Sequence, residues 1–225
     1  MRDLLAAVVM GLVVCLMVGP AAAITVLDFE GLANLEPVLS FYNGGLGGNG
    51  TGPGPNLGAV FSSNALAVID ADAGGTGNIG HEPSPSTALF FLTGPAATLN
   101  FSAGFDTGFS FFYSAVNNPG SITVYDDLNG TGTILATLAL PVTASDGGDP
   151  NGAFSPLIPV GVAFAGIARS IDFGGTVNQI AFDDITFGSA TPGPPAAVPE
   201  PGTLLLLGTA MSGFGLARWR RRRAS

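Results

Sequence analysis

Residues 24–187 form a succession of short apolar segments, each bounded by Gly, Pro, Asn or Asp. Several segments alternate between apolar and polar positions, most clearly at Phe109, Phe111 and Tyr113. A period of two is typical of strands with one buried face, whereas an amphipathic helix needs apolar residues three or four positions apart. No stretch between residues 24 and 187 has a convincing helical stripe, so the pattern predicts an all-β domain.

Eleven segments fit the pattern of strands, and their number and spacing predict a jelly-roll-like β-sandwich over residues 24–187. The expected strands are 25–29, 59–62, 65–69, 88–92, 97–101, 108–114, 121–125, 133–140, 158–164, 170–173 and 179–187. Between two of them, Asn129 and Gly130 favour a tight hairpin turn, because Asn and Gly tolerate positive φ. Residues 188–197 are rich in Pro, Gly and Ala, which predicts an extended linker.

Acidic residues far outnumber basic residues in residues 24–198, which we call the body of the chain. Residues 24–198 hold fourteen Asp and Glu residues against Arg169 and no Lys, a formal net charge of −13. Nucleic acid is excluded as a partner, because binding to phosphates relies on clustered Lys and Arg. This imbalance favours solubility, cation binding and association with basic or neutral surfaces.

The N-terminal segment has the features of a secretory signal peptide over residues 1–23. Arg2 precedes an apolar run over residues 4–18, and the small residues Ala21 and Ala23 suit cleavage by signal peptidase after Ala23. The alternative is a retained membrane anchor. Cleavage would remove Cys15, the only cysteine, so no disulfide is expected in the mature protein.

The C-terminal segment combines an apolar stretch with a dense basic end. Residues 203–217 form a run that would span about 22 Å as a helix, shorter than the ~30 Å hydrocarbon core but able to cross it with local thinning. The positive-inside bias keeps the basic end cytoplasmic, so it acts as a stop-transfer element. Its members are Arg218, Arg220, Arg221, Arg222 and Arg223.

The tail over residues 198–225 resembles the PEP-CTERM sorting signal of Gram-negative bacteria, which is also described as the C-terminal domain of ice-binding proteins. The resemblance rests on the apolar run, the arginine cluster and the preceding motif Val198, Pro199, Glu200 and Pro201. It implies processing near this motif by the membrane protease exosortase. The implied route is an intermediate anchored in the inner membrane, followed by delivery to the cell surface or the extracellular matrix.

Two pairs of acids form a candidate metal site. Asp28 and Glu30 are two residues apart on the first expected strand and therefore share a face. The apolar phase of the last expected strand switches at Asp183 and Asp184, so a bulge absorbs the change or one acid is drawn toward the core. If these strands are neighbours, the four oxygen ligands suit Ca²⁺, the only cofactor that the sequence suggests. The alternative is that all four acids are solvated; Asp70 and Asp72 are a lesser candidate pair.

Two other features lack the partners that chemistry would need. His81 is the only histidine and lies in a polar segment with no evident nucleophile beside it, which favours a solvated loop residue. Residues 44–58 hold eight glycines, but no Lys-Ser or Lys-Thr pair and no helix follow, so a surface loop is expected in place of a phosphate site.

Three classes of function compete. We expect a non-catalytic surface or matrix protein that associates with exopolysaccharide or a biofilm, because the chain carries an export tail and no catalytic motif. A carbohydrate-binding module of lectin type is the first alternative, although Trp is absent from residues 24–198. A secreted glycoside hydrolase is the second alternative, because two carboxylates distant in sequence can still form an acid pair.

Overall fold

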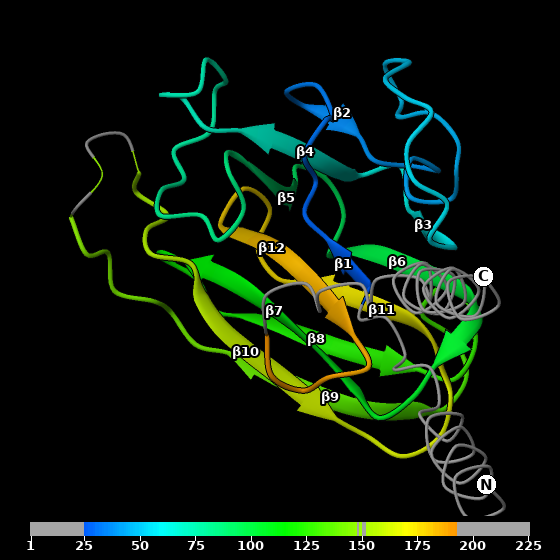
Figure 1. Ribbon diagram of the computed structural model, residues 1–225. Coiled ribbons are helices and arrows are strands. Elements are labelled where there is room, and N and C mark those ends of the chain that lie inside the picture. The colour runs from blue at the N-terminus through cyan, green and yellow to red at the C-terminus, as the bar shows by residue number, and fades with distance from the viewer. Residues whose placement is uncertain (1–24, 148, 150–151, 193–225) are drawn as a thin grey trace, which may run out of the picture. The chain divides into compact units, whose positions relative to one another are not determined.

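The computed structural model describes residues 25–147, 149 and 152–192 (Figure 1). The predicted signal peptide, sorting motif and membrane span lie outside these residues. Within the described ranges the chain forms strands, turns and loops, with no helix. Accordingly, these ranges offer no helix that is long and apolar enough to cross a membrane.

The strands form two antiparallel sheets, as expected for a β-sandwich (Figure 1). In the seven-stranded sheet the order is β10-β7-β12-β5-β4-β2, and β1 pairs with the end of β12; in the five-stranded sheet it is β3-β6-β11-β8-β9. The bounds are β1 Thr25–Leu27, β2 Glu36–Pro37, β3 Ala59–Phe61, β4 Ala65–Ile69, β5 Thr87–Phe91, β6 Ala96–Phe105, β7 Gly108–Ala115, β8 Gly120–Tyr125, β9 Ile134–Leu140, β10 Ile158–Ala163, β11 Ala168–Gly174 and β12 Ile180–Phe187.

Each of the eleven expected strands is present, with ends that differ by a few residues. Sequence reasoning missed β2, because two residues that include a proline are too few to show alternation. The expected turn is also confirmed, since Asn129 and Gly130 both have positive φ, 60° and 67°.

Aromatic side chains from both sheets fill the space between them. Phe111 of β7 and Phe182 of β12 face Phe173 of β11, with ring centroids 5.8 and 5.0 Å from Phe173. All three side chains are fully buried. These edge-on contacts add to the hydrophobic gain of burying three large rings, so the core is centred on the β7, β11 and β12 strands.

The phase switch in β12 is a bulge. The pairing of β12 with β7 shifts register between Asp183 and Thr186, and Asp184 has a φ of 48°. The extra residue brings Ile185 back to the core face that Phe182 occupies, and both are fully buried. Asp183 is buried as well, so both expected consequences of the switch occur together.

A buried carboxylate organises the glycine-rich loop. Glu36 is fully buried, and its Oε1 accepts hydrogen bonds from the backbone N–H groups of Asn49 (2.8 Å) and Thr51 (3.1 Å). Its Oε2 accepts one from Ala33 N–H at 2.7 Å. A side chain at Gly47 would collide with this carboxylate, so the loop needs glycine there. The loop over residues 44–58 is therefore built around an internal anion.

The hydrogen bonds to Glu36 also determine how its carboxyl titrates. Burial alone would raise its pKa, but the hydrogen bonds from Thr51, Ala33 and Asn49 outweigh burial and lower the pKa. Because the folded-state pKa lies below the unfolded value, Glu36 stabilises the fold above the unfolded pKa. This contribution is lost as the pH falls through the folded pKa.

We expect Glu36→Gln to lower the free energy of unfolding by about 2 kcal/mol at neutral pH, because an amide group cannot accept all three backbone donors. Urea denaturation of the β-sandwich measures the change. Asp106→Asn is the matched control, since Asp106 is exposed and its carboxylate accepts from the side chain of Thr107. Equal stability of the Glu36→Gln variant and the wild type would show that Glu36 does not support the loop.

Candidate functional site

The predicted acids come together at one end of the β1 and β12 pair. The prediction that Asp28 and Glu30 share a face of the first strand is wrong, because β1 ends at Leu27 and the φ of 60° at Phe29 breaks the extended chain. Antiparallel pairing sets Leu27 opposite Ile185, so the segment after β1, with Asp28 and Glu30, still passes beside Asp183 and Asp184. The charge of Asp184 raises the pKa of Asp183, and the charges of Asp28 and Glu30 act on Asp184 in the same way. The four carboxylates therefore share one electrostatic environment.

Asp183 is the interior member of this group. Its Oδ2 accepts from Ser84 Oγ–H at 2.8 Å and lies 3.4 Å from Ser84 N, and its Oδ1 accepts from Asp184 N–H at 2.7 Å. Burial, and then the charge of Asp184, raise the pKa of Asp183 well above its usual range. Ser84 Oγ also lies 3.1 Å from the carbonyl of Asp28, so a protonated Asp183 can donate to Ser84 while Ser84 donates to Asp28.

The other three acids lie at the rim. Asp28 Oδ1 accepts from the hydroxyl of Tyr42 at 3.2 Å, and Glu30 Oε1 accepts from the backbone N–H groups of Ser86 and Thr87, both at 2.8 Å. Burial, followed by the charges of Asp28 and Glu30, raises the pKa of Asp184 to about 6. One oxygen of Asp28 and one of Glu30 remain available to a ligand.

A second acidic group meets the spacing that a cation requires. One carboxylate oxygen from each of Asp70, Asp72 and Asp149 lies within 4.8 Å of the others, the only such group among the described residues. Asp70 is buried, and its pKa is raised by this burial and by the hydrogen bond that its protonated carboxyl donates to Asp72. The pair Asp70 and Asp72 was visible in the sequence, but Asp149 is distant in the chain and was missed.

Glu82 lies in the field of this second group. Its Oε1 is buried and has no hydrogen-bond partner among the described residues. Burial, followed by the nearby charges of Asp70, Asp149 and Asp72, raises the pKa of Glu82 to about 6. Of the two groups, only Asp70, Asp72 and Asp149 have carboxylate oxygens spaced as Ca²⁺ ligands; Asp28, Glu30, Asp183 and Asp184 do not meet this spacing among the described residues.

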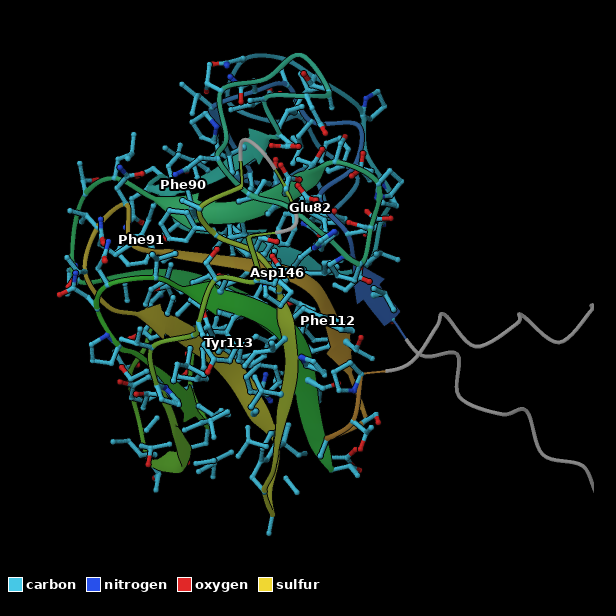
Figure 2. All side chains as sticks on the ribbon, turned by 90° about the vertical axis from the view of Figure 1, so that its left-hand side faces the viewer. Glu82, Phe90, Phe91, Phe112, Tyr113 and Asp146 are labelled. Atoms are coloured by element: carbon cyan, nitrogen blue, oxygen red, sulfur yellow. The ribbon has the colours of Figure 1, made fainter. Side chains whose placement is uncertain are left out.

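His81 has partners that the sequence did not reveal. Its Nδ1 lies 2.8 Å from Asp146 Oδ2 and 3.2 Å from Ser155 Oγ, while Ser155 Oγ also donates to Asp146 Oδ1 at 2.9 Å (Asp146 is labelled in Figure 2). In a Ser-His-Asp triad the serine and the acid contact different nitrogens of the imidazole. Here both contact Nδ1, so His81 is not placed to relay a proton between them.

An uncharged pocket opens on the outer face of the seven-stranded sheet. Successive residues of β5 alternate, so Phe91 enters the core between the sheets while Phe90 faces outward (both labelled in Figure 2). Phe154 covers the same face, because residues 79 and 154 form a parallel bridge. The pocket has a volume of about 200 Å³ and is lined by Leu35, Val68, Thr76, Gly77, Asn78, Ile79, Phe90, Leu92, Phe154, Asn178, Ile180 and Ala181.

The raised pKa values predict an unusual pH dependence. Asp70, Glu82, Asp183 and Asp184 all have folded-state pKa values above the usual range, so their contribution to stability is fully present below about pH 4 and is lost as the pH rises through their folded-state values. Without divalent cations, we expect a higher thermal midpoint near pH 5 than near pH 8. Calorimetry in chelator measures it.

Asp183→Asn tests whether the buried carboxyl of Asp183 is protonated in the folded protein. Because the neutral amide resembles the protonated carboxyl, we expect this variant to be at least as stable as the wild type near pH 8 and to show a flatter pH profile. Asp106→Asn is again the control. A large loss of stability in Asp183→Asn at high pH would mean that the buried carboxylate is ionised.

We expect added Ca²⁺ to raise the thermal midpoint near pH 7. At a free concentration tenfold above the dissociation constant, the free energy of unfolding should increase by about 1.4 kcal/mol. Asp72→Asn should remove this shift, because the group that contains Asp72 has suitable spacing. Loss of the shift in Asp184→Asn would instead assign the ion to the predicted group of Asp28, Glu30, Asp183 and Asp184. An unchanged midpoint with and without chelator would contradict both sites.

Solved structures with a similar arrangement of strands include carbohydrate-binding modules. The module CBM6cm-2 of Cellvibrio mixtus lichenase 5A, in complex with cellotriose, is 15% identical over 56% of this chain and 88% of its own, with a TM-score of 0.35. The module CsCBM6-3 of Clostridium stercorarium, in complex with cellobiose, is 18% identical over 57% and 84%, with a TM-score of 0.35. The K3 adhesin domain of Lys-gingipain from Porphyromonas gingivalis is 15% identical over 76% and 94%, with a TM-score of 0.30.

At these scores the likeness to solved structures carries no conclusion about function. None of the curated proteins compared with the chain matches it. Residues 197–223 match the family model of the PEP-CTERM protein-sorting motif. This motif implies export in a Gram-negative bacterium, by way of a membrane-anchored sorting intermediate, to the cell surface. The chain thus carries a PEP-CTERM protein-sorting motif on the C-terminal side of its β-sandwich, as its C-terminal sequence predicts.

Proposed function

We propose that this chain is a non-catalytic protein of the bacterial surface or extracellular matrix, processed by signal peptidase and exosortase and associated there with polysaccharide. The observation that carries the proposal is the sorting motif at residues 197–223, which follows a compact β-sandwich after a short linker. The body, of the jelly-roll-like type, is directed into the periplasm by residues 1–23, which signal peptidase then removes. The tail holds it at the inner membrane until exosortase acts at residues 198–201.

The path of the chain through the sandwich suits a tethered protein. Thr25 pairs with Phe187, so the chain enters β1 and leaves β12 at the same end. Ile180, at the other end of β12, lines the uncharged pocket and lies roughly 20 Å away at about 3.3 Å per residue. The pocket therefore lies at the end of β12 opposite to the one where the chain leaves the sandwich.

The arrangement of reactive groups supports a non-catalytic body. Ser155, His81 and Asp146 lie together, but two of the contacts fall on the same imidazole nitrogen. Ser155 is also buried, with 1% of its surface exposed. The acids repel one another and take up protons, which suits cation binding and solubility. Release of reducing ends from a polysaccharide by the purified protein would overturn this part of the proposal and favour a glycoside hydrolase.

We expect a chain that ends at Val198 to lose membrane association, because the apolar run and the arginines that stop its transfer are deleted. Fractionation of a host that contains exosortase should find the full-length precursor in the membrane and the shortened chain in soluble fractions. Glu200→Ala is the matched control: it alters only the processing motif, so uncleaved precursor should accumulate in the membrane. A shortened chain that stays membrane-bound would contradict the assigned role of the tail.

A further inference from the structure

We propose that the uncharged pocket binds one neutral pyranose unit of a polysaccharide. The proposal rests on the proposed function, since it names the chemistry by which the exported body would hold a matrix polymer. Four features of the pocket lead to it: apolar walls, a rim of free amide groups, the absence of charge from its lining, and its size.

The walls offer an apolar surface to a ring. Phe90 and Phe154 are 8% and 9% exposed, and together with Val68, Ile79 and Ala181 they form a hydrophobic cluster separate from the main core. At the mouth, Leu35 and Leu92 are exposed by 43% and 45%. A pyranose presents C–H groups on one face, which such a surface can bury, and hydroxyls around its edge, which need polar partners.

The polar partners are two carboxamides. The side chains of Asn78 and Asn178 are exposed, and neither forms a hydrogen bond within the described part of the protein. Their backbones are fixed: the carbonyl of Asn78 accepts from Phe154 N–H at 2.9 Å, and Asn178 N–H donates to Phe91 at 2.9 Å. Each amide offers donors and an acceptor, so a pair of them can bind neighbouring hydroxyls, each of which both donates and accepts.

The charge of the surroundings selects a neutral ligand. No Asp, Glu, Lys, Arg or His is among the lining residues, although the body has fourteen acids. A uronic acid or sulfated sugar would meet no cation in this pocket and would be repelled by the acidic body. A fatty acyl chain would bury well against the walls, but it would make no use of the donors and acceptors of the two amides.

The size of the pocket limits the ligand to about one ring. A volume of about 200 Å³ lies below the usual range of drug-sized sites. A single small neutral ligand binds weakly, so we expect a dissociation constant of about 1 mM for a monosaccharide. Many copies of the protein on one polymer would then hold it by avidity.

The test uses the full-length chain in lipid nanodiscs, titrated with the methyl glycosides of neutral hexoses and 6-deoxyhexoses. Binding is followed by saturation-transfer NMR and calorimetry. We expect at least one of these glycosides to saturate the protein. Asn178→Asp, which places a charge at the rim, should weaken the binding of that glycoside at least about tenfold. Asp tolerates the φ of 56° at this position, so the fold is preserved.

Asn43→Asp is the matched control, because it makes the same change of charge at an exposed residue outside the pocket. It should bind like the wild type. Phe90→Leu, which keeps an apolar side chain but removes the ring, should also weaken binding. The proposal is overturned if no neutral glycoside saturates the protein, if Asn178→Asp binds as tightly as Asn43→Asp, or if only acyl chains bind. Correct sorting of the chain in the fractionation experiment, together with any of these results, would leave the proposed function standing.

Discussion

The scarcity of cations governs how this sandwich is built. Arg169 is the only Lys or Arg in residues 24–198; its Nη1 donates to the backbone carbonyl of Ser102, and it forms no ion pair with an acid within the described ranges. Buried carboxylates are therefore held by N–H and O–H donors. Glu36 accepts hydrogen bonds from three backbone N–H groups and so orders the glycine-rich loop. Asp183 accepts one from the hydroxyl of Ser84, beside the loop that follows β1.

The two kinds of carboxylate have opposite consequences. Where donors outnumber neighbouring charges, as at Glu36, the pKa falls and the group stabilises the fold as an anion. Where burial and other acids dominate, as at Asp184 and Glu82, the pKa rises to about 6 and the group favours a proton or a cation. Groups of this second kind would therefore respond to the pH and the divalent cations of the medium that the protein enters.

The chain divides its tasks between a body and a tail. The tail contains the sorting signal, which consists of an apolar run, arginines and a processing motif and does not depend on the fold of the preceding domain. In our proposal, the β-sandwich binds the polysaccharide. The core residues of the sandwich pack between the two sheets and are not accessible to a ligand. The pocket lies instead on the outer face of the seven-stranded sheet, and its lining includes Phe90, Phe154, Asn78 and Asn178.

Local sequence alone determined the all-β class, eleven of the twelve strands, the break in β12 and the sorting motif, because alternation, turn residues and the tail are patterns of adjacent residues. The predicted closeness of Asp28, Glu30, Asp183 and Asp184 followed from pairing the first and last strands, and β1 does pair with β12. Tertiary structure decided the rest. The partners of Glu36, the approach of Asp149 to Asp70, the contact of His81 with Ser155 and the pocket between Phe90 and Phe154 all join loops that are distant along the chain. Such contacts depend on how the strands are ordered in the sheets, which no local pattern records.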